Sequence, residues 1–135
     1  MSKPAVHALS DVQKFGGQVS DYLNIHNLMD SSKSAVSSNL HRFLTHNSHF
    51  VGHILEKIFG VYFTNSDGRI IQVRDIGERH VLQDFQNKFL PTAQDWASTM
   101  TVQPWQLGRG TPPSFKSLER YHAGVGKDQK FVILD

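Results

Sequence analysis

Cysteine is missing from this 135-residue chain. Its absence excludes disulfide bonds, thiolate metal ligands and a cysteine nucleophile, and it fits a reducing compartment. No apolar run approaches the ~20 residues of a membrane-spanning helix, and residues 1–10 lack the apolar core of a signal peptide. We therefore expect a cytoplasmic protein that has no membrane partner.

Clustered positive charge is missing as well. The chain has 14 basic and 12 acidic residues, a formal net charge of +2, and no run of Lys and Arg. Proteins that bind duplex nucleic acid usually carry a basic stripe, so we do not expect nucleic acid as a partner. Eight histidines are present, and exposed histidines add positive charge near their usual pKa of about 6.5. A small anion could use that charge.

The order of helix and strand signals predicts an α+β fold. Helical periods dominate as far as residue 60, and β-branched and aromatic residues then indicate strands at 61–64 and 69–73 around the turn sequence N-S-D-G. We predict a mostly helical single domain with one β-hairpin over residues 1–108. Residues 109–135 are predicted to form an irregular C-terminal strap that is available to dock on a partner subunit.

Capping patterns predict where the helices begin. Ser10 and Gln13 have the form of a capping box, so the first helix is expected to begin there. A helix from about residue 32 is expected to run into the next periodic stretch, and Asp75 is expected to cap a helix over 76–88. A further short helix is expected after Thr92. We find no internal repeat in the chain.

Residues 39–60 form the longest periodic run. As one helix, the run would bury an apolar face and present a polar ribbon on its opposite side. Asn47 would fall in the apolar face and Ser48 is a good N-cap residue, so a break into two helices there is an open alternative. The predicted core positions are Leu40, Phe43, Leu44, Phe50, Val51, Ile54, Leu55 and Ile58, and the polar ribbon comprises Arg42, His46, His49 and His53.

Histidine spacing raises the possibility of a metal site. His49 and His53 lie one helical turn apart with Glu56 three residues further on, which can place three ligands around one ion. The pattern is not HExxH, because Phe50 follows His49 and no general base is built in. A solvated helix face or an oligomer contact explains the same spacing. We expect no metal, no cofactor and no catalytic group; the alternative is a metal-dependent phosphodiesterase or other hydrolase that uses these three residues and His46.

A small phosphorylated ligand suits the composition better. Such a site needs arginine or lysine for the phosphates, N–H groups at a helix start and aromatic faces for bases. Arg74 ends a strand immediately before a capped helix. Trp105 lies in a proline-rich stretch, where stacking on a base and ordinary packing are both open.

A dozen short motifs together resemble a family of small phage and bacterial proteins over about residues 5–105. The motifs are His7-Ala8-Leu9-Ser10, Phe15-Gly16-Gly17, Asp21-Tyr22-Leu23, Ile25-His26, Ser32-Lys33, His41-Arg42 with His46, Ile58-Phe59-Gly60, Asn65-Ser66-Asp67-Gly68-Arg69, Val73-Arg74, Ile76-Gly77-Glu78 with His80-Val81, and Pro91-Thr92 with Asp95-Trp96.

This family is similar to the phage anti-CBASS sponges, which sequester a host cyclic dinucleotide without cleaving it. The resemblance implies a non-enzymatic immune-evasion protein of the host cytoplasm. It also implies a homo-oligomer, a tetramer, that holds 3′,3′-cyclic GMP-AMP or a relative near subunit contacts. The ligand-binding residues expected from the matching motifs and from the chemistry of their side chains are His26, Lys33, His41, Arg42, His46, Arg74 and His80, together with Trp105 as a stacking surface.

Overall fold

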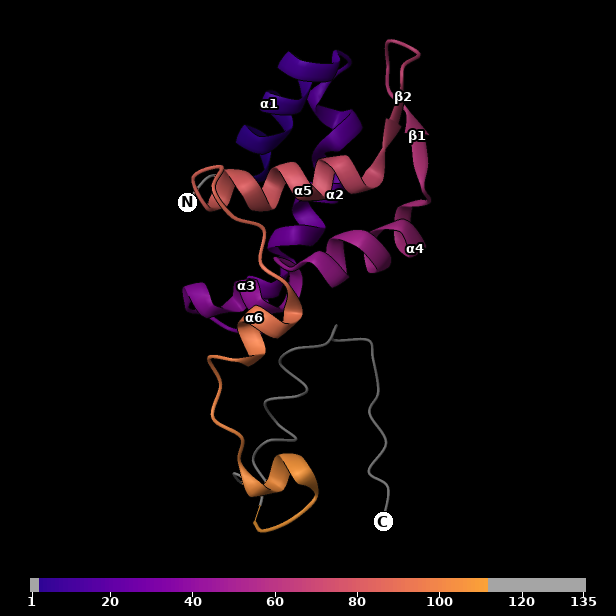
Figure 1. The fold of residues 1–135 in the computed structure, drawn as a ribbon. Helices are drawn as coiled ribbons and strands as arrows, with labels where there is room; N and C mark the ends of the chain where they lie inside the picture. The colour runs from indigo at the N-terminus through magenta and orange to yellow at the C-terminus, as the bar shows by residue number, and fades with distance from the viewer. Residues whose placement is uncertain (1–2, 112–135) are drawn as a thin grey trace. The chain divides into compact units, whose positions relative to one another are not determined.

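The computed structural model describes residues 3–111, and it confirms the predicted α+β fold class with helices and one antiparallel two-stranded sheet (Figure 1). The chain divides into two compact units, the first ending at Ser98 and the second beginning at Thr99. In the second unit, the 3-10 helix η4 (Pro104–Leu107) carries Trp105. Of the predicted strap, residues 112–135 lie outside the described part. No helix within 3–111 combines the length and apolar character needed to cross a membrane.

Three helices of 12 residues each form the frame of the first unit. The second of them packs against the first and the third, and Figure 1 shows the third crossing in front of it. These helices are α1 (Pro4–Phe15), α2 (Val19–Asp30) and α5 (Val73–Asp84). Between α2 and α5 come η1 (Ser31–Ser34), η2 (Asn39–His41), α3 (Arg42–Thr45), the π-helix η3 (Phe50–Ile54), α4 (Leu55–Phe59) and a hairpin.

The predicted hairpin is confirmed, with β1 (Tyr62–Thr64) antiparallel to β2 (Ile70–Gln72). Asn65 begins its turn. The Asn65 side-chain oxygen accepts backbone N–H bonds from within the turn, and its amide donates to Phe15 O and to the Tyr22 hydroxyl at 3.2 and 3.1 Å. The turn therefore also fastens the hairpin to α1 and α2.

The run 39–60 is broken, as the alternative interpretation allowed. The chain leaves helical geometry after α3 and resumes it at Ser48, and Asn47 bridges the break. Its amide donates to Phe43 O and its oxygen accepts from the Phe50 N–H, both at 2.9 Å. The buried amide is thus satisfied by the backbone on either side of the break.

The predicted single apolar face of that run is wrong. Leu40, Leu44 and Ile58 are 64%, 40% and 54% exposed, whereas Val51 and Leu55 are fully buried. The break is the physical reason, because residues before and after it no longer follow one helical period. In the second half, Val51 and Leu55 keep the predicted orientation toward the core, whereas Ile58 does not.

Two predicted helix starts are also wrong. Helix α1 begins at Pro4 rather than near Ser10, since proline suits the first helical position and its missing N–H is not needed there. The helix expected from residue 32 is a single 3-10 turn. The hydroxyls of Ser31 and Ser34 donate to backbone carbonyls three residues earlier, a local bond that competes with continued helix.

Helix α5 begins three residues before the predicted Ile76, so Asp75 lies in its first turn rather than at its cap. It ends at Asp84, because Gln86 and Asn87 take positive φ angles of 60° and 59°. The short helix after Thr92 is confirmed as α6 (Ala93–Ala97), with the Thr92 hydroxyl accepting a backbone bond.

Glycine permits the closest helix contact in the first unit. Gly77 in α5 faces α4 and η3, where a Cβ atom would overlap Leu55 Cδ1 and lie 3.1 Å from Val51 Cγ1. The lack of a side chain therefore sets how closely α5 approaches these helices.

Gly77→Ala is expected to lower the free energy of unfolding by about 1–3 kcal/mol, because the added methyl group overpacks the core. Urea denaturation measures the loss. Gly52→Ala is the matched control, since it also lies in a helical segment and its methyl group would approach no neighbour closer than 3.9 Å. Equal stability of the two variants would contradict the close packing at Gly77.

Candidate metal centre

Imidazole rings occupy much of the interior of the first unit. Five histidines are at most 1% exposed, and three aspartates are buried beside them. Buried polar groups are costly unless they are hydrogen-bonded or coordinate a metal. The buried histidines are His7, His26, His41, His46 and His80, and the aspartates are Asp11, Asp30 and Asp84.

Six of these residues belong to a repeated motif that the sequence analysis missed. The pattern H-x-L-x-D occurs at residues 7–11, 26–30 and 80–84, once in each of α1, α2 and α5. Residues four apart lie on the same face of a helix. Each of the three helices therefore turns one histidine and one aspartate toward the same interior region.

Four side chains converge there to within metal-binding distance. One donor atom from each of Asp30, His46, His80 and Asp84 lies within 4.8 Å of all the others. His46 Nε2 is 2.8 Å from Asp84 Oδ2 and 4.0 Å from Asp30 Oδ1. His80 Nε2 is 3.3 and 3.1 Å from the same two oxygens. We call these four residues the metal centre.

A chain of hydrogen bonds fixes the tautomer of His80. The Asp11 carboxylate accepts from Arg79 Nε at 2.8 Å and from His26 Nε2. Since a carboxylate only accepts, His26 carries its proton on Nε2, and its Nδ1 must accept from His80 Nδ1, 2.8 Å away. His80 therefore has its proton on Nδ1 and directs the lone pair of Nε2 into the metal centre.

The tautomer of His46 follows by the same reasoning. The Thr45 hydroxyl donates to Met29 O at 2.6 Å, so its oxygen is left to accept from His46 Nδ1 at 2.8 Å. His46 Nε2 then also presents a lone pair to the centre. Outer partners of this kind orient metal-binding histidines and set their tautomers.

The result is four atoms with lone pairs that face one another. The four nitrogen–oxygen separations across the centre are 2.8–4.0 Å, and atoms with facing lone pairs repel unless a cation or a proton lies between them. Asp30 Oδ2, also buried, has no hydrogen-bond partner among residues 3–111.

The pKa values show which sites hold protons without a metal. Burial lowers the pKa of His80, but its hydrogen bonds to Asp30 and Asp84 outweigh burial and raise it above the ordinary value. Burial lowers the pKa of His46. Burial raises the pKa of Asp84, but its contacts with His46, His7 and His80, which stabilise the carboxylate whenever the facing nitrogens carry protons, hold it well below its usual range. A proton on His80 thus substitutes for part of the charge that a metal would supply.

The centre lies just below the surface. Its two histidines are fully buried, and the Asp30 and Asp84 side chains are 8% and 2% exposed. Lys33 Nζ is 3.9 Å from Asp30 Oδ2 and is 42% exposed. The Asp30 edge is therefore the side of the centre nearest to solvent.

Of the predicted ligand-binding residues, the structure brings His26, His46 and His80 together in the interior, where each has protein partners. His41 is buried nearby, with Nδ1 2.7 Å from the Ser32 hydroxyl. Lys33 borders the centre from outside. Their role as ligand contacts remains a prediction.

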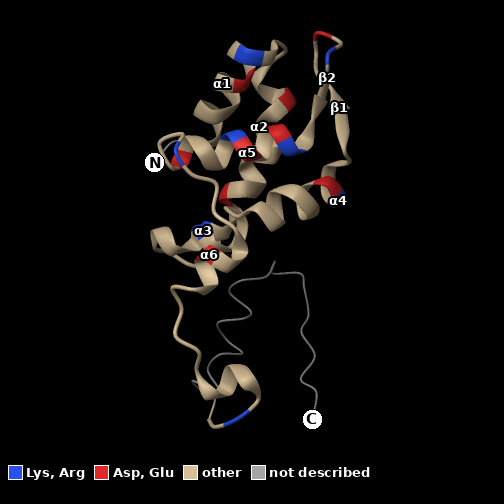
Figure 2. Cartoon of the chain, in the orientation of Figure 1, with Lys and Arg blue, Asp and Glu red and all other residues tan. Residues whose placement is uncertain are grey.

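The other three predicted residues lie elsewhere. Arg42 stacks over the Phe85 ring at 5.7 Å. Arg74 ion-pairs with Glu56 at 3.3 Å. Trp105 belongs to the second unit. Figure 2 shows acidic and basic residues interspersed over α1, α5 and the hairpin, which agrees with the small net charge.

The alternative metal set does not assemble. Within residues 3–111, the metal centre is the one group of three or more His, Asp or Glu donors close enough to share an ion. His49 and His53 are neighbours, with ring centroids 5.3 Å apart, but His46 is buried with the centre instead.

The chain belongs to a family described as a domain of unknown function, DUF6915, whose model matches residues 2–106. No curated protein and no solved structure matches it.

His26→Ala tests the buried hydrogen-bond chain. The change leaves His80 Nδ1 and one Asp11 oxygen without their partners, and each such buried group costs roughly 1–3 kcal/mol. Chemical denaturation of chelator-treated protein measures the loss of stability separately from any metal effect. His49→Ala, which removes an exposed ring, is expected to change stability by less than about 0.5 kcal/mol. Equal stabilities would show that the chain of bonds does not contribute.

Proposed function

We propose that this DUF6915 protein is a metalloprotein that holds one divalent transition-metal ion between Asp30, His46, His80 and Asp84. The observation that carries the proposal is the set of opposed lone pairs, because the outer hydrogen bonds occupy both Nδ1 protons and leave both Nε2 atoms free to coordinate. The two carboxylates would balance the charge of a divalent ion.

Zinc is the ion that suits these donors best. Zinc takes imidazole nitrogen and carboxylate oxygen at about 2.0–2.2 Å in a tetrahedron, which separates neighbouring donors by about 3.3 Å. The four separations between an imidazole nitrogen and a carboxylate oxygen, 2.8, 3.1, 3.3 and 4.0 Å, bracket that value. Calcium and magnesium prefer six or more oxygen ligands, so they fit less well.

The burial of the ligands supports a structural role for the ion. Structural zinc sites have four protein ligands, whereas catalytic ones usually have three ligands and a water. Here four protein side chains are available and none is more than 8% exposed. The ion would tie α2, the segment after α3 and α5 together.

Zinc added to chelator-treated protein is expected to bind at about one ion per chain and to raise the thermal midpoint. Free zinc at 100 times its Kd would stabilise the folded state by about 2.7 kcal/mol. Plasma mass spectrometry gives the stoichiometry and calorimetry the midpoint. Asp84→Asn, which keeps the size of the side chain, should weaken binding at least tenfold.

His53→Ala is the matched control for that experiment, because it removes an exposed histidine of the alternative set His46, His49, His53 and Glu56. It should bind zinc like the parent protein. Circular dichroism checks that Asp84→Asn is folded. If zinc binding survives in Asp84→Asn and disappears in His53→Ala, the ion binds the alternative set and the proposed metal centre is wrong.

Sequestration of a cyclic dinucleotide in the cytoplasm is a second proposal, and it comes from the family resemblance. Two observations support it. Lys33 and Arg74 are 42% and 47% exposed, so both cations can reach a phosphate. Exposed apolar side chains on the hairpin, Tyr62 at 58% and Ile70 at 70%, suit self-assembly into the expected homo-oligomer.

Incubation with 3′,3′-cyclic GMP-AMP, followed by heat denaturation and analysis of the released nucleotide, tests this second proposal. Intact recovery from a tetramer, measured by light scattering, is the expected result, because sequestration needs no bond cleavage. A cleaved product that a chelator suppresses would instead make the protein a metal-dependent hydrolase. Absence of any retained nucleotide would reject sequestration, and absence of any cleaved product in the mixture would reject the hydrolase.

A further inference from the structure

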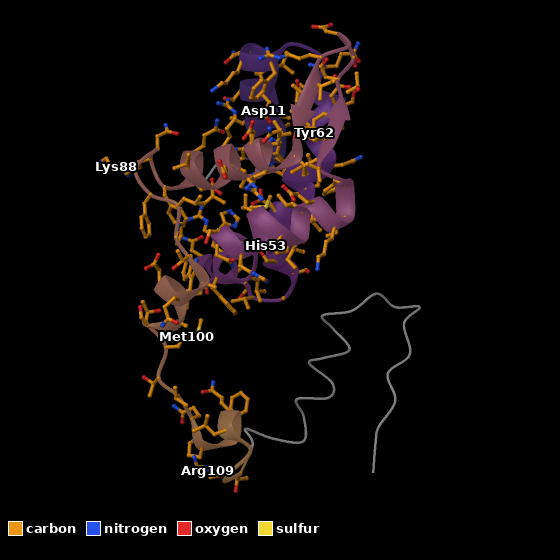
Figure 3. The ribbon with its side chains drawn as sticks, turned by 45° about the vertical axis from the view of Figure 1, so that its right-hand side comes forward. Asp11, His53, Tyr62, Lys88, Met100 and Arg109 are labelled. Atoms are coloured by element: carbon orange, nitrogen blue, oxygen red, sulfur yellow. The ribbon has the colours of Figure 1, made fainter. Side chains whose placement is uncertain are left out.

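A surface cavity of about 570 Å³ lies in the first unit, apart from the metal centre. Its volume falls within the range typical of small-molecule sites, about 300–1,000 Å³. None of the four metal-centre residues lines it. Figure 3 labels His53, which lines the cavity, on the opposite side of α5 from Asp11. The lining residues used below are His49, His53, Arg74, Glu78 and Gln94.

Arg74 is held in place at the wall of the cavity. Its Nη2 donates to Gly52 O at 3.1 Å and lies 3.3 Å from Glu56 Oε1. The guanidinium is thus preorganised while 47% of the side chain stays exposed.

A π-helix supplies the two histidines. His53 lies in η3, and His49 occupies its N-cap position. Single π-helical turns are rare and often occur at functional sites. Both rings are exposed, and no hydrogen bond from another residue of 3–111 engages them. Their nitrogens are therefore available to a ligand.

The charges in the cavity favour an anion. Arg74 is always protonated, and two imidazoles lie in the same cavity. Glu78 is the one acidic side chain among the lining residues, and burial, followed by the charge of Asp75, raises its pKa. Burial thus disfavours the charged form of Glu78, so this side chain opposes an anion less than a fully exposed carboxylate would.

We infer that this cavity binds a phosphate-bearing polyol, such as a sugar phosphate, with the phosphate on Arg74, His49 and His53. Guanidinium and imidazole N–H groups donate hydrogen bonds to phosphate oxygens. The side chains of Glu78 and Gln94 remain for the hydroxyl groups of the ligand. The site does not depend on the metal ion, and it stands whether or not the protein sequesters a cyclic dinucleotide.

Ribose 5-phosphate is a direct probe. Titrated into the zinc-treated full-length chain, it should give saturable shifts in the imidazole NMR signals of His49 and His53. Arg74→Gln should weaken binding at least tenfold, the effect of losing about 1.4 kcal/mol of a charge-assisted bond. Lys57→Gln is the matched control, because it makes the same charge change on α4, is exposed and does not line the cavity.

Ribose and inorganic phosphate test separately whether the cavity recognises the phosphate group and the hydroxyl groups of the ligand. Ribose without phosphate should not bind, and inorganic phosphate should bind more weakly than the sugar phosphate. Equal affinity of inorganic phosphate would overturn the polyol assignment. Equal weakening by Lys57→Gln and Arg74→Gln, or unshifted signals of both histidines, would overturn the site. A cyclic dinucleotide that binds Arg74→Gln normally would leave sequestration intact and exclude this cavity as its location.

Discussion

Two imidazole nitrogens and two carboxylate oxygens that face one another in the interior are the constraint on which the rest of this structure depends. The Nδ1–H groups of His80 and His46 point away from the centre, and each needs an acceptor there. His26 Nδ1 and the Thr45 hydroxyl are these acceptors. Those acceptors need partners of their own, which are Asp11 and a backbone carbonyl. A cation at the centre would satisfy all of these atoms together, because a buried charge or lone pair without a partner is strongly unfavourable.

The helices of the three-helix frame bury apolar side chains on one stripe and histidine and aspartate side chains on the adjoining stripe. In α2, Ile25 and Met29 are buried in the apolar core while His26 and Asp30 face the centre. In α5, Ile76 and Gly77 pack toward α4, and His80 follows one turn later. Each helix therefore buries two adjoining stripes. This explains why strict apolar periodicity is weak in a helix that is nonetheless well buried.

The sequence predicts this fold where local turn and capping chemistry decide, at the N-S-D-G hairpin and the Thr92 cap, and it allows the break at Asn47 as an alternative. It fails where burial decides. The helical period predicts His46 on an exposed polar ribbon, whereas the structure buries it fully. The H-x-L-x-D repeat is the sequence signal for the buried histidines and aspartates of α1, α2 and α5. Even that motif would not have identified His46, which lies outside it and reaches the centre only through tertiary packing.

The low exposure of the metal-centre side chains limits how a ligand in solvent can reach them. His46, His80 and Asp84 are at most 2% exposed, so a solvent-borne ligand reaches the centre only along the Asp30 edge. Lys33 occupies that edge at 3.9 Å from Asp30. A cation bound at Asp30 Oδ1 would weaken the attraction of the carboxylate for Lys33, which lies near Oδ2, since both positive charges are attracted to the same carboxylate group. Lys33 is a predicted ligand-binding residue that is exposed. Its freedom to contact a phosphate would depend on whether Asp30 holds a cation.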